Sequence, residues 1–140
     1  MRVMIIGGTK FMGPHVVKRM KDMGHEVTAF HRGQSELEPS LGAEELFGDR
    51  NDFNTLKEAI ETCAPDVIVD MVLFTVGQAQ GLQVAAQGIA KRVVAVSGID
   101  VYQAYGRLHR AGITPIEKPP ITEDSPLLSV DMPLVVAGPR

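Results

Sequence analysis

The segment from Gly7 to Gly13 has the composition of a phosphate-binding turn. It follows the apolar run Val3–Ile6 and precedes a stretch, 11–23, whose apolar side chains recur with helical spacing. Glycines at such a turn let the backbone approach a phosphate closely, and the N-terminus of the next helix offers free N–H groups and a positive dipole end. Gly7 permits the tight turn, and Gly13 permits close packing of the helix on the strand. The alternative is a plain strand-to-helix turn. The phosphate loop that we predict consists of Gly7, Gly8, Thr9, Lys10, Phe11, Met12 and Gly13.

Strands and helices are predicted to alternate along the first hundred residues. Short apolar runs closed by glycine or proline predict strands at 3–6, 27–30, 44–47, 67–69 and 93–96. Helical spacing predicts helices at 11–23, at 53–63 with Asp52 as the N-cap, and at 78–90. This alternation is typical of βαβ units, so we predict an α/β fold with a doubly wound parallel sheet of about five strands. The expected strand order is 3-2-1-4-5.

The composition and the hydrophobic pattern of the chain change beyond residue 101. Residues 115–139 contain six of the nine prolines, and no strand–helix period continues there. We therefore predict a folded domain over 1–101 and a proline-rich, irregular tail over 102–140. A structureless segment of this length is uncommon in a compact domain, which favours a longer protein of which this chain is a part.

The composition limits the classes of protein to consider. With 140 residues, a net charge of −3 and 44% hydrophobic residues, the chain resembles one ordinary globular domain. It has no apolar run that approaches the ~20 residues of a membrane span, and we expect no secretory leader. Its only cysteine, Cys63, cannot form an internal disulfide, and its four histidines show no metal-ligand spacing. These features favour the cytoplasm and predict no membrane and no metal.

Charge is distributed unevenly along the sequence. The first 35 residues carry six basic and two acidic side chains, whereas the chain as a whole is acidic. An acidic majority argues against a general nucleic-acid surface, because phosphate contacts need clustered Lys and Arg. The basic N-terminal part suits a small anionic ligand instead, unless its charges only form a solvated helix face.

Several segments together resemble the NAD-dependent epimerase/dehydratase family, the extended and atypical short-chain dehydrogenase/reductases. Gly-Gly-Thr-Lys-Phe-Met-Gly is similar to the glycine motif of that family. Four further segments match in order: 27–33 is similar to its second strand, 48–52 to its Gly-Asp segment, 66–71 to its fourth strand, and 93–102 to its fifth strand with a Ser-Ser-x-x-Val-Tyr signature. The resemblance implies the N-terminal Rossmann portion of that fold, incomplete relative to the whole family fold.

The resemblance also implies a nicotinamide dinucleotide as cofactor. Lys10 replaces the middle glycine of the motif, where its side chain either crowds the pyrophosphate or reaches a phosphate. Arg32 follows the second strand, where NAD-specific members present a carboxylate to the ribose 2′-hydroxyl; a guanidinium suits a 2′-phosphate, so NADP is favoured over NAD. Asp49 matches the residue that accepts the adenine amino group. The remaining positions implied as cofactor contacts are His31, Arg50, Met71 and Val72.

The catalytic residues of the family have no full counterpart in this sequence. The family resemblance implies a hydroxyl–Tyr–Lys arrangement, with Tyr and Lys four residues apart on a helix. Gly106 and His109 lie four residues after the two tyrosines, so Tyr-x-x-x-Lys is absent. Ser97 stands one position before the expected hydroxyl and is a weak catalytic candidate. We expect an NAD(P)-binding domain that is inactive by itself in the nucleotide-sugar epimerase, dehydratase or related oxidoreductase reactions of the family.

Other interpretations stay open from the sequence. The missing Tyr-x-x-x-Lys favours a non-catalytic sensor of NADP that acts through a partner. Some atypical members of the family bind RNA in plastids, although the acidic balance of this chain weighs against that role. The predicted fifth strand would be an edge of the sheet, so we expect self-association or low stability of the isolated chain.

Overall fold

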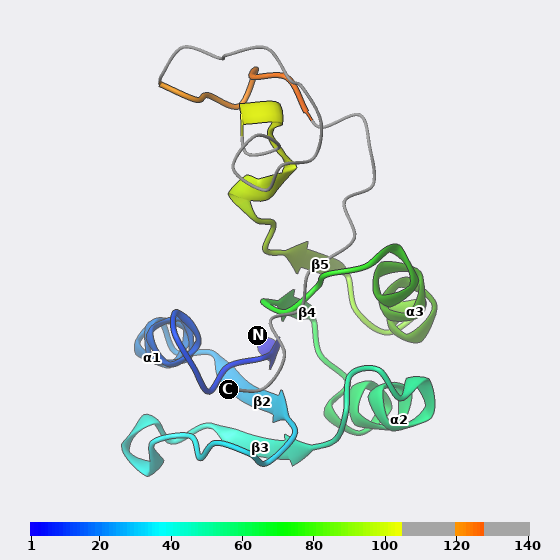
Figure 1. Ribbon diagram of the computed structural model, residues 1–140. Coiled ribbons are helices and arrows are strands. Elements are labelled where there is room, and N and C mark those ends of the chain that lie inside the picture. Colours follow the sequence, from blue (N-terminus) through cyan, green and yellow to red (C-terminus); the bar gives the residue numbers. More distant parts are fainter. Residues whose placement is uncertain (105–119, 128–140) are drawn as a thin grey trace. The chain divides into compact units, whose positions relative to one another are not determined.

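A five-stranded parallel sheet is the central element of the computed structural model, which describes residues 1–104 and 120–127 (Figure 1). The strands are β1 (Arg2–Ile6), β2 (Glu26–His31), β3 (Glu44–Phe47), β4 (Val67–Asp70) and β5 (Arg92–Ala95). They pair in the order β3-β2-β1-β4-β5, and every pair is parallel. The predicted α/β fold class and strand order are confirmed.

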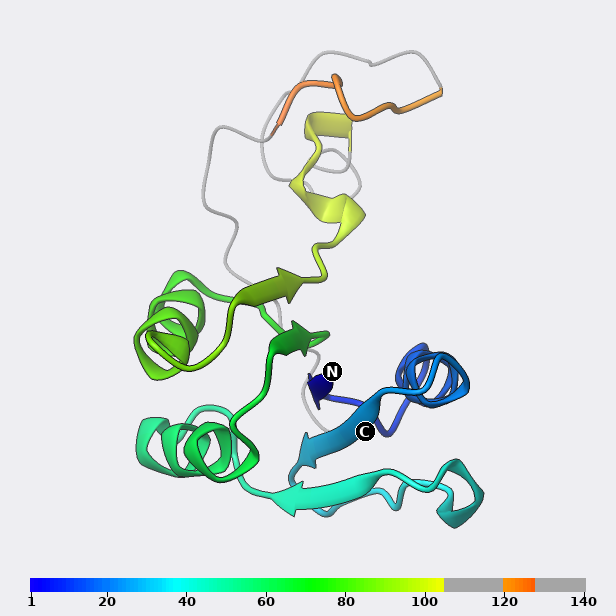
Figure 2. The same cartoon turned by 180° about the vertical axis from the view of Figure 1, so that it is seen from behind.

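Helices cover both faces of this sheet. Helix α1 (Gly13–Asp22) lies on one face, and helices α2 (Phe53–Cys63) and α3 (Val76–Ala86) lie on the other, as Figures 1 and 2 show from opposite sides. Because side chains alternate along a strand, Val3 and Ile5 pack in the cluster on the α1 side, and Met4 and Ile6 pack in the cluster that includes α2 and α3. Both faces of β1 are therefore buried, which explains its continuous apolar run.

Local signals explain where the first two helices begin and end. Pro14 lies in the first turn of α1, where its missing N–H is tolerated, and Gly24 follows the helix with φ +79°. The side chain of Asp52 caps α2 by accepting hydrogen bonds from the backbone N–H groups of Asn54 and Thr55. Helix α2 has the predicted bounds and ends at Cys63; Ala64 follows as the C-cap, and its left-handed backbone closes the last turn.

Helix α3 differs from the prediction at both ends. It spans Val76–Ala86, whereas the sequence predicted 78–90. Thr75 and Gln78 form a capping box: the Thr75 hydroxyl accepts from the Gln78 N–H, and the Gln78 side chain accepts from the Thr75 N–H. This box starts the helix two residues earlier than expected. At the other end, Gln87 leaves the helical conformation and Gly88 has φ +78°, so the helix stops before the following apolar residues.

Strand β5 is at an edge of the sheet within the described residues. It is hydrogen-bonded to β4 on one side, and all four of its residues are exposed. Val93 and Val94 are 41% and 42% exposed, which is high for the middle of a strand in a parallel sheet. This exposure agrees with the edge position expected from the sequence, while self-association stays a prediction.

The chain divides into two compact units, Met1–Ser97 and Gly98–Arg140. The described part of the second unit contains a short 3-10 helix, Ile99–Val101, and an antiparallel bridge between Tyr102 and Leu127. The predicted boundary at residue 101 lies inside this second unit. Most of the predicted tail, 102–140, lies outside the described residues, and its irregularity stays a prediction.

Candidate functional site

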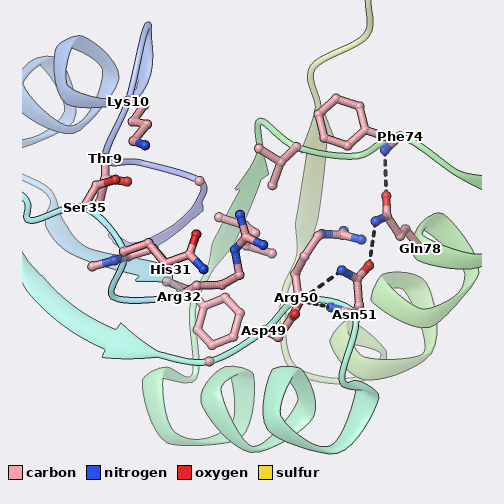
Figure 3. A pocket seen from close by; sticks show the side chains of 16 residues that line it. Thr9, Lys10, His31, Arg32, Ser35, Asp49, Arg50, Asn51, Phe74 and Gln78 are labelled. Carbon is pink, nitrogen blue, oxygen red and sulfur yellow. Dashed lines mark hydrogen bonds between the residues drawn. The ribbon is translucent and has the colours of Figure 1, made fainter. Parts of the chain in front are cut away.

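A cavity of about 280 Å³ opens at the carboxyl ends of strands β1, β2, β3 and β4 (Figure 3). In a parallel α/β sheet this edge is where ligands bind, next to the point at which the strand order reverses. In Figure 3, Lys10, Thr9 and Ser35 lie on one side of the cavity and Asn51, Gln78 and Phe74 on the other. Eight of the predicted contact residues line the cavity: Gly7, Thr9, Lys10, His31, Arg32, Asp49, Arg50 and Val72.

The glycine loop is shaped by two close approaches. Gly7 has φ +84°, and a Cβ there would lie 2.8 Å from Cγ1 of Val72. A Cβ on Gly13 would lie 2.5 Å from the carbonyl carbon of Gly8, so only glycine lets α1 begin against the loop. The loop therefore has the close helix–strand packing that the sequence predicts.

Five predicted contact residues do not line the cavity. Phe11 is 88% exposed and has φ 54°, an uncommon backbone conformation for a residue with a side chain. Met12 is also exposed, and Met71 packs beside the core cluster on the α1 side. The other two, Gly8 and Gly13, are buried in the loop. A role of these five in ligand binding stays a prediction.

Two cationic side chains at the cavity have no ionic partner in the described part of the chain. Lys10 comes from the glycine loop and Arg32 from the end of β2, and both line the cavity. Within residues 1–104 and 120–127, no hydrogen bond or ion pair involves either side chain's charged group. The nearby end of the cavity thus carries uncompensated positive charge, which favours an anionic ligand.

His31 fixes the chain segment that carries Arg32. Its ring is buried; Nδ1 accepts a hydrogen bond from the N–H of Gly33 at 3.3 Å, and Nε2 lies 2.7 Å from Oε2 of Glu45. Because Nδ1 is the acceptor, the proton of the neutral ring is on Nε2 and is donated to Glu45. The edge of the ring also contacts Phe47, with ring centroids 5.0 Å apart. These contacts hold the start of the loop after β2.

A chain of hydrogen bonds joins the two loops on the other side of the cavity. Oδ1 of Asp49 accepts from the backbone N–H of Asn51 at 2.8 Å and from its side-chain amide at 3.0 Å. Gln78 donates to Oδ1 of Asn51 at 2.8 Å, and its own carbonyl accepts from the backbone N–H of Phe74 at 2.7 Å. Figure 3 shows this connection from Asp49 to Phe74. The loop after β3 is therefore tied to the loop after β4.

A buried ion pair also joins the loop after β3 to the end of β4. Nη2 of Arg50 donates to Oδ2 of Asp70, which is fully buried at the end of β4. Oδ1 of Asp70 accepts from the backbone N–H of Val72 at 3.0 Å. Nε and Nη1 of Arg50 are buried and have no hydrogen-bond partner among the described residues. The sequence placed Arg50 at the site but gave no sign of its pairing with Asp70.

Several residues that line the cavity were not predicted as ligand contacts from the sequence. They are Gln34 and Ser35 after β2, Gly48 and Asn51 after β3, and Phe74 and Gln78 after β4. Most are loop residues whose position depends on how neighbouring loops meet. The Thr75-x-x-Gln78 spacing is a capping-box signal, and it would have placed Gln78 at a helix start beside this edge of the sheet.

The catalytic candidate and the tyrosines considered in the sequence do not line the cavity among the described residues. Ser97 is exposed after β5 and does not line the cavity. Tyr102 belongs to the second unit, and Tyr105 and His109 lie outside the described residues. The described part of the chain also contains no cluster of His, Cys, Asp and Glu that could hold a metal ion. Among the described helices, none is long and apolar enough to cross a membrane.

Comparisons with known proteins agree with this architecture. The sequence profile of the NAD dependent epimerase/dehydratase family matches residues 3–107. The chloroplast stem-loop binding protein of 41 kDa b of Arabidopsis thaliana is 30% identical, over 50% of this chain and 22% of that protein. The bifunctional pinoresinol-lariciresinol reductase of Sinopodophyllum hexandrum is 28% identical, over 71% of this chain and 32% of that protein.

Solved structures show the same fold. The enzyme WbmG of Bordetella bronchiseptica, solved in complex with NAD, is 20% identical with a TM-score of 0.72 over 91% of this chain and 44% of that one. The UDP-glucose-4-epimerase of Stenotrophomonas maltophila, solved with NAD and formylated UDP-arabinopyranose, is 17% identical with a TM-score of 0.72 over 93% of this chain and 43% of that one. This chain spans less than half the length of each of these proteins.

The sheet order, the helices on both faces and the glycine loop define a Rossmann-like domain. The chain belongs to the NAD dependent epimerase/dehydratase family, whose profile covers most of its length.

Proposed function

We propose that this chain is a nicotinamide-dinucleotide-binding domain and that the cavity is the dinucleotide site. The observation that carries this proposal is the pair of cations, Lys10 and Arg32, which have no ionic partner among the described residues and lie beside a loop in which Gly7 and Gly13 leave no room for a Cβ. A nicotinamide dinucleotide contains a pyrophosphate, and the end of the cavity that holds these two cations is suited to such an anion. The NAD complexes of WbmG and of the Stenotrophomonas epimerase, which share the fold, support the same ligand class.

The cavity residues suggest how such a ligand would be oriented. Because Lys10 and Arg32 both line the cavity, we propose that Lys10 meets the phosphates at the glycine loop and that Arg32 meets a ribose 2′-phosphate, which favours NADP over NAD. Asp49 keeps one oxygen, Oδ2, without a hydrogen bond among the described residues, and this oxygen is free to accept from the adenine amino group. When bound, the nicotinamide ring supplies hydride chemistry, and the role of these residues is to bind and orient it.

We propose that catalysis on a substrate needs residues beyond those of this chain. The family includes nucleotide-sugar epimerases and dehydratases, and this sequence lacks the Tyr-x-x-x-Lys pair. We therefore propose that the domain alone binds the cofactor without turnover, either as part of an enzyme or as a non-catalytic NADP sensor. The exposed edge strand β5 supports self-association, and the single cysteine is consistent with the cytoplasm.

Nucleic-acid binding is a second candidate function. The Arabidopsis relative is named for binding a stem-loop, and it matches this chain at 30% identity. The net charge of −3 argues against a broad phosphate-binding surface. A filter-binding assay with an RNA hairpin discriminates between the two: retention of the hairpin that NADPH displaces would support a shared site, and absence of retention at low salt would exclude RNA.

The test of the dinucleotide proposal is a calorimetric titration of the purified chain with NADPH and, in parallel, with NADH. We expect binding of both with a micromolar dissociation constant for NADPH and weaker binding of NADH. Absence of heat with both, on a chain that melts cooperatively, would refute the proposal. Equal affinities would retain the site but remove the preference assigned to Arg32.

A further inference from the structure

Arg50 carries buried hydrogen-bond donors that the described chain leaves unsatisfied. Its side chain is 8% exposed, Nη2 donates to Asp70, and both Nε and Nη1 lack a partner. The residue lines the cavity, and Figure 3 shows it next to Asp49 and Asn51. A buried donor without a partner is costly for a folded protein, and such groups in native structures call for an acceptor. A ligand in the cavity would supply one.

Asp70 determines what kind of acceptor Arg50 can favour. Its carboxylate is fully buried and directly bonded to the guanidinium, so the pair is electrically neutral as a unit. Arg32 and Lys10 have no such counter-charge among the residues that the structure describes. The cavity therefore has a cationic part at these two residues and a neutral, donor-rich part at Arg50. An anion gains Coulomb energy in the first part, whereas the second offers directed hydrogen bonds with little net charge.

We propose that Arg50 is a recognition residue for an uncharged acceptor in the adenosine half of the ligand, a ring nitrogen or a ribose hydroxyl. This inference rests on the dinucleotide site proposed above. Asp70 acts as a positioning residue: it holds the guanidinium through Nη2, leaves Nε and Nη1 for the ligand, and cancels the charge that would otherwise attract a phosphate. The same carboxylate accepts a hydrogen bond from the backbone N–H of Val72. One side chain at the end of β4 therefore fixes both the Arg50 guanidinium and the backbone at Val72.

The test compares Arg50→Lys with Arg32→Met as a control. The lysine keeps a positive charge beside Asp70 but lacks the planar donors, so the ion pair persists while the extra hydrogen bonds are lost. Calorimetric titrations use NADH and NADPH at 0.1 M and 1 M salt, where the Debye length falls from about 10 Å to about 3 Å. We expect Arg50→Lys to weaken both ligands about tenfold, equally at both salt concentrations, as for one hydrogen bond to a charged donor. Arg32→Met should weaken only NADPH, and less so at 1 M salt.

Three results would overturn the proposal. Unchanged affinity of Arg50→Lys would show that Nε and Nη1 do not contact the ligand. A loss confined to NADPH, or one that shrinks in high salt, would show that Arg50 contacts a phosphate. If the wild-type chain binds neither ligand, the proposed function fails and this inference fails with it. If Arg50→Lys lowers the Tm of the free chain, the double variant Arg50→Met with Asp70→Asn replaces it. This variant removes both charges, so its affinities for NADH and NADPH can be compared with those of the wild type without an unpaired buried charge.

Discussion

Replacing Gly13 by alanine tests whether the loop geometry determines both stability and binding. The added Cβ would lie 2.5 Å from the carbonyl carbon of Gly8, 2.6 Å from its oxygen and 2.8 Å from the oxygen of Gly7. All three are backbone atoms of the loop, so no side-chain rotation relieves the overlap. Overpacking of this kind lowers the free energy of unfolding by about 2 kcal/mol, which corresponds to roughly 5–12 °C in Tm for a domain of this size.

Gly81→Ala is the matched control for this change. Gly81 lies inside α3, and a Cβ there would have its nearest contact at 3.8 Å, on the ring of Phe53. Alanine in an unobstructed helix interior raises the free energy of unfolding by about 0.5–1 kcal/mol. Thermal unfolding followed by circular dichroism should thus move in opposite directions for the two variants, and Gly13→Ala should also weaken NADPH binding. A Gly13→Ala chain that melts at or above the wild-type temperature would refute the close-packing argument.

Three further outcomes are expected. Arg32→Asp should weaken NADPH binding about 10- to 100-fold and reverse the preference towards NADH in calorimetry, because a charge-assisted contact becomes a repulsion; an unchanged preference would contradict its assignment. The hydrogen bond from the backbone N–H of Arg2 holds the pKa of Asp66 below its usual value. The Asp66 carboxylate therefore stabilises the fold at any pH above its usual pKa, and this contribution is lost as the pH falls through the lowered pKa. Asp66→Asn should accordingly flatten the decline of Tm in calorimetric scans taken from about pH 5 to about pH 2, and an unchanged slope would count against this linkage. Leu82→Ala, in the core, should lower the free energy of unfolding in urea by about 2–5 kcal/mol, whereas Val84→Ala, 59% exposed on the same helix, should change it by less than about 0.5 kcal/mol; similar losses would show that α3 does not pack as described.

The fold was predictable because its signals are local. The continuous apolar run of β1 marks a strand buried on both faces, and Asp52 marks the start of α2 through its side-chain acceptor. Helix α3 was misjudged because its apolar residues have almost no helical asymmetry and Gly81 interrupts them. Its true start depends on the capping box of Thr75 and Gln78, a two-residue signal that a search for apolar spacing does not detect.

The site was less predictable because its parts meet only in three dimensions. Lys10 and Arg32 could be placed at the cavity from their positions at strand ends. The pairing of Arg50 with Asp70 joins residues 20 positions apart in the sequence, and nothing in either local sequence indicates it. Likewise Asn51 and Gln78, 27 positions apart, meet only because the loops after β3 and β4 lie at the same edge of the sheet.

The most direct test of the dinucleotide site is a titration of the ¹⁵N-labelled chain with NADPH, followed by amide chemical shifts. We expect the largest shifts on the loop from Gly7 to Lys10, on Arg32 and on the segment from Asp49 to Asn51, and no shift of the amide of Val84, an exposed residue of α3 outside the cavity lining. Shifts that cluster elsewhere on the domain, or none at saturating NADPH, would contradict it.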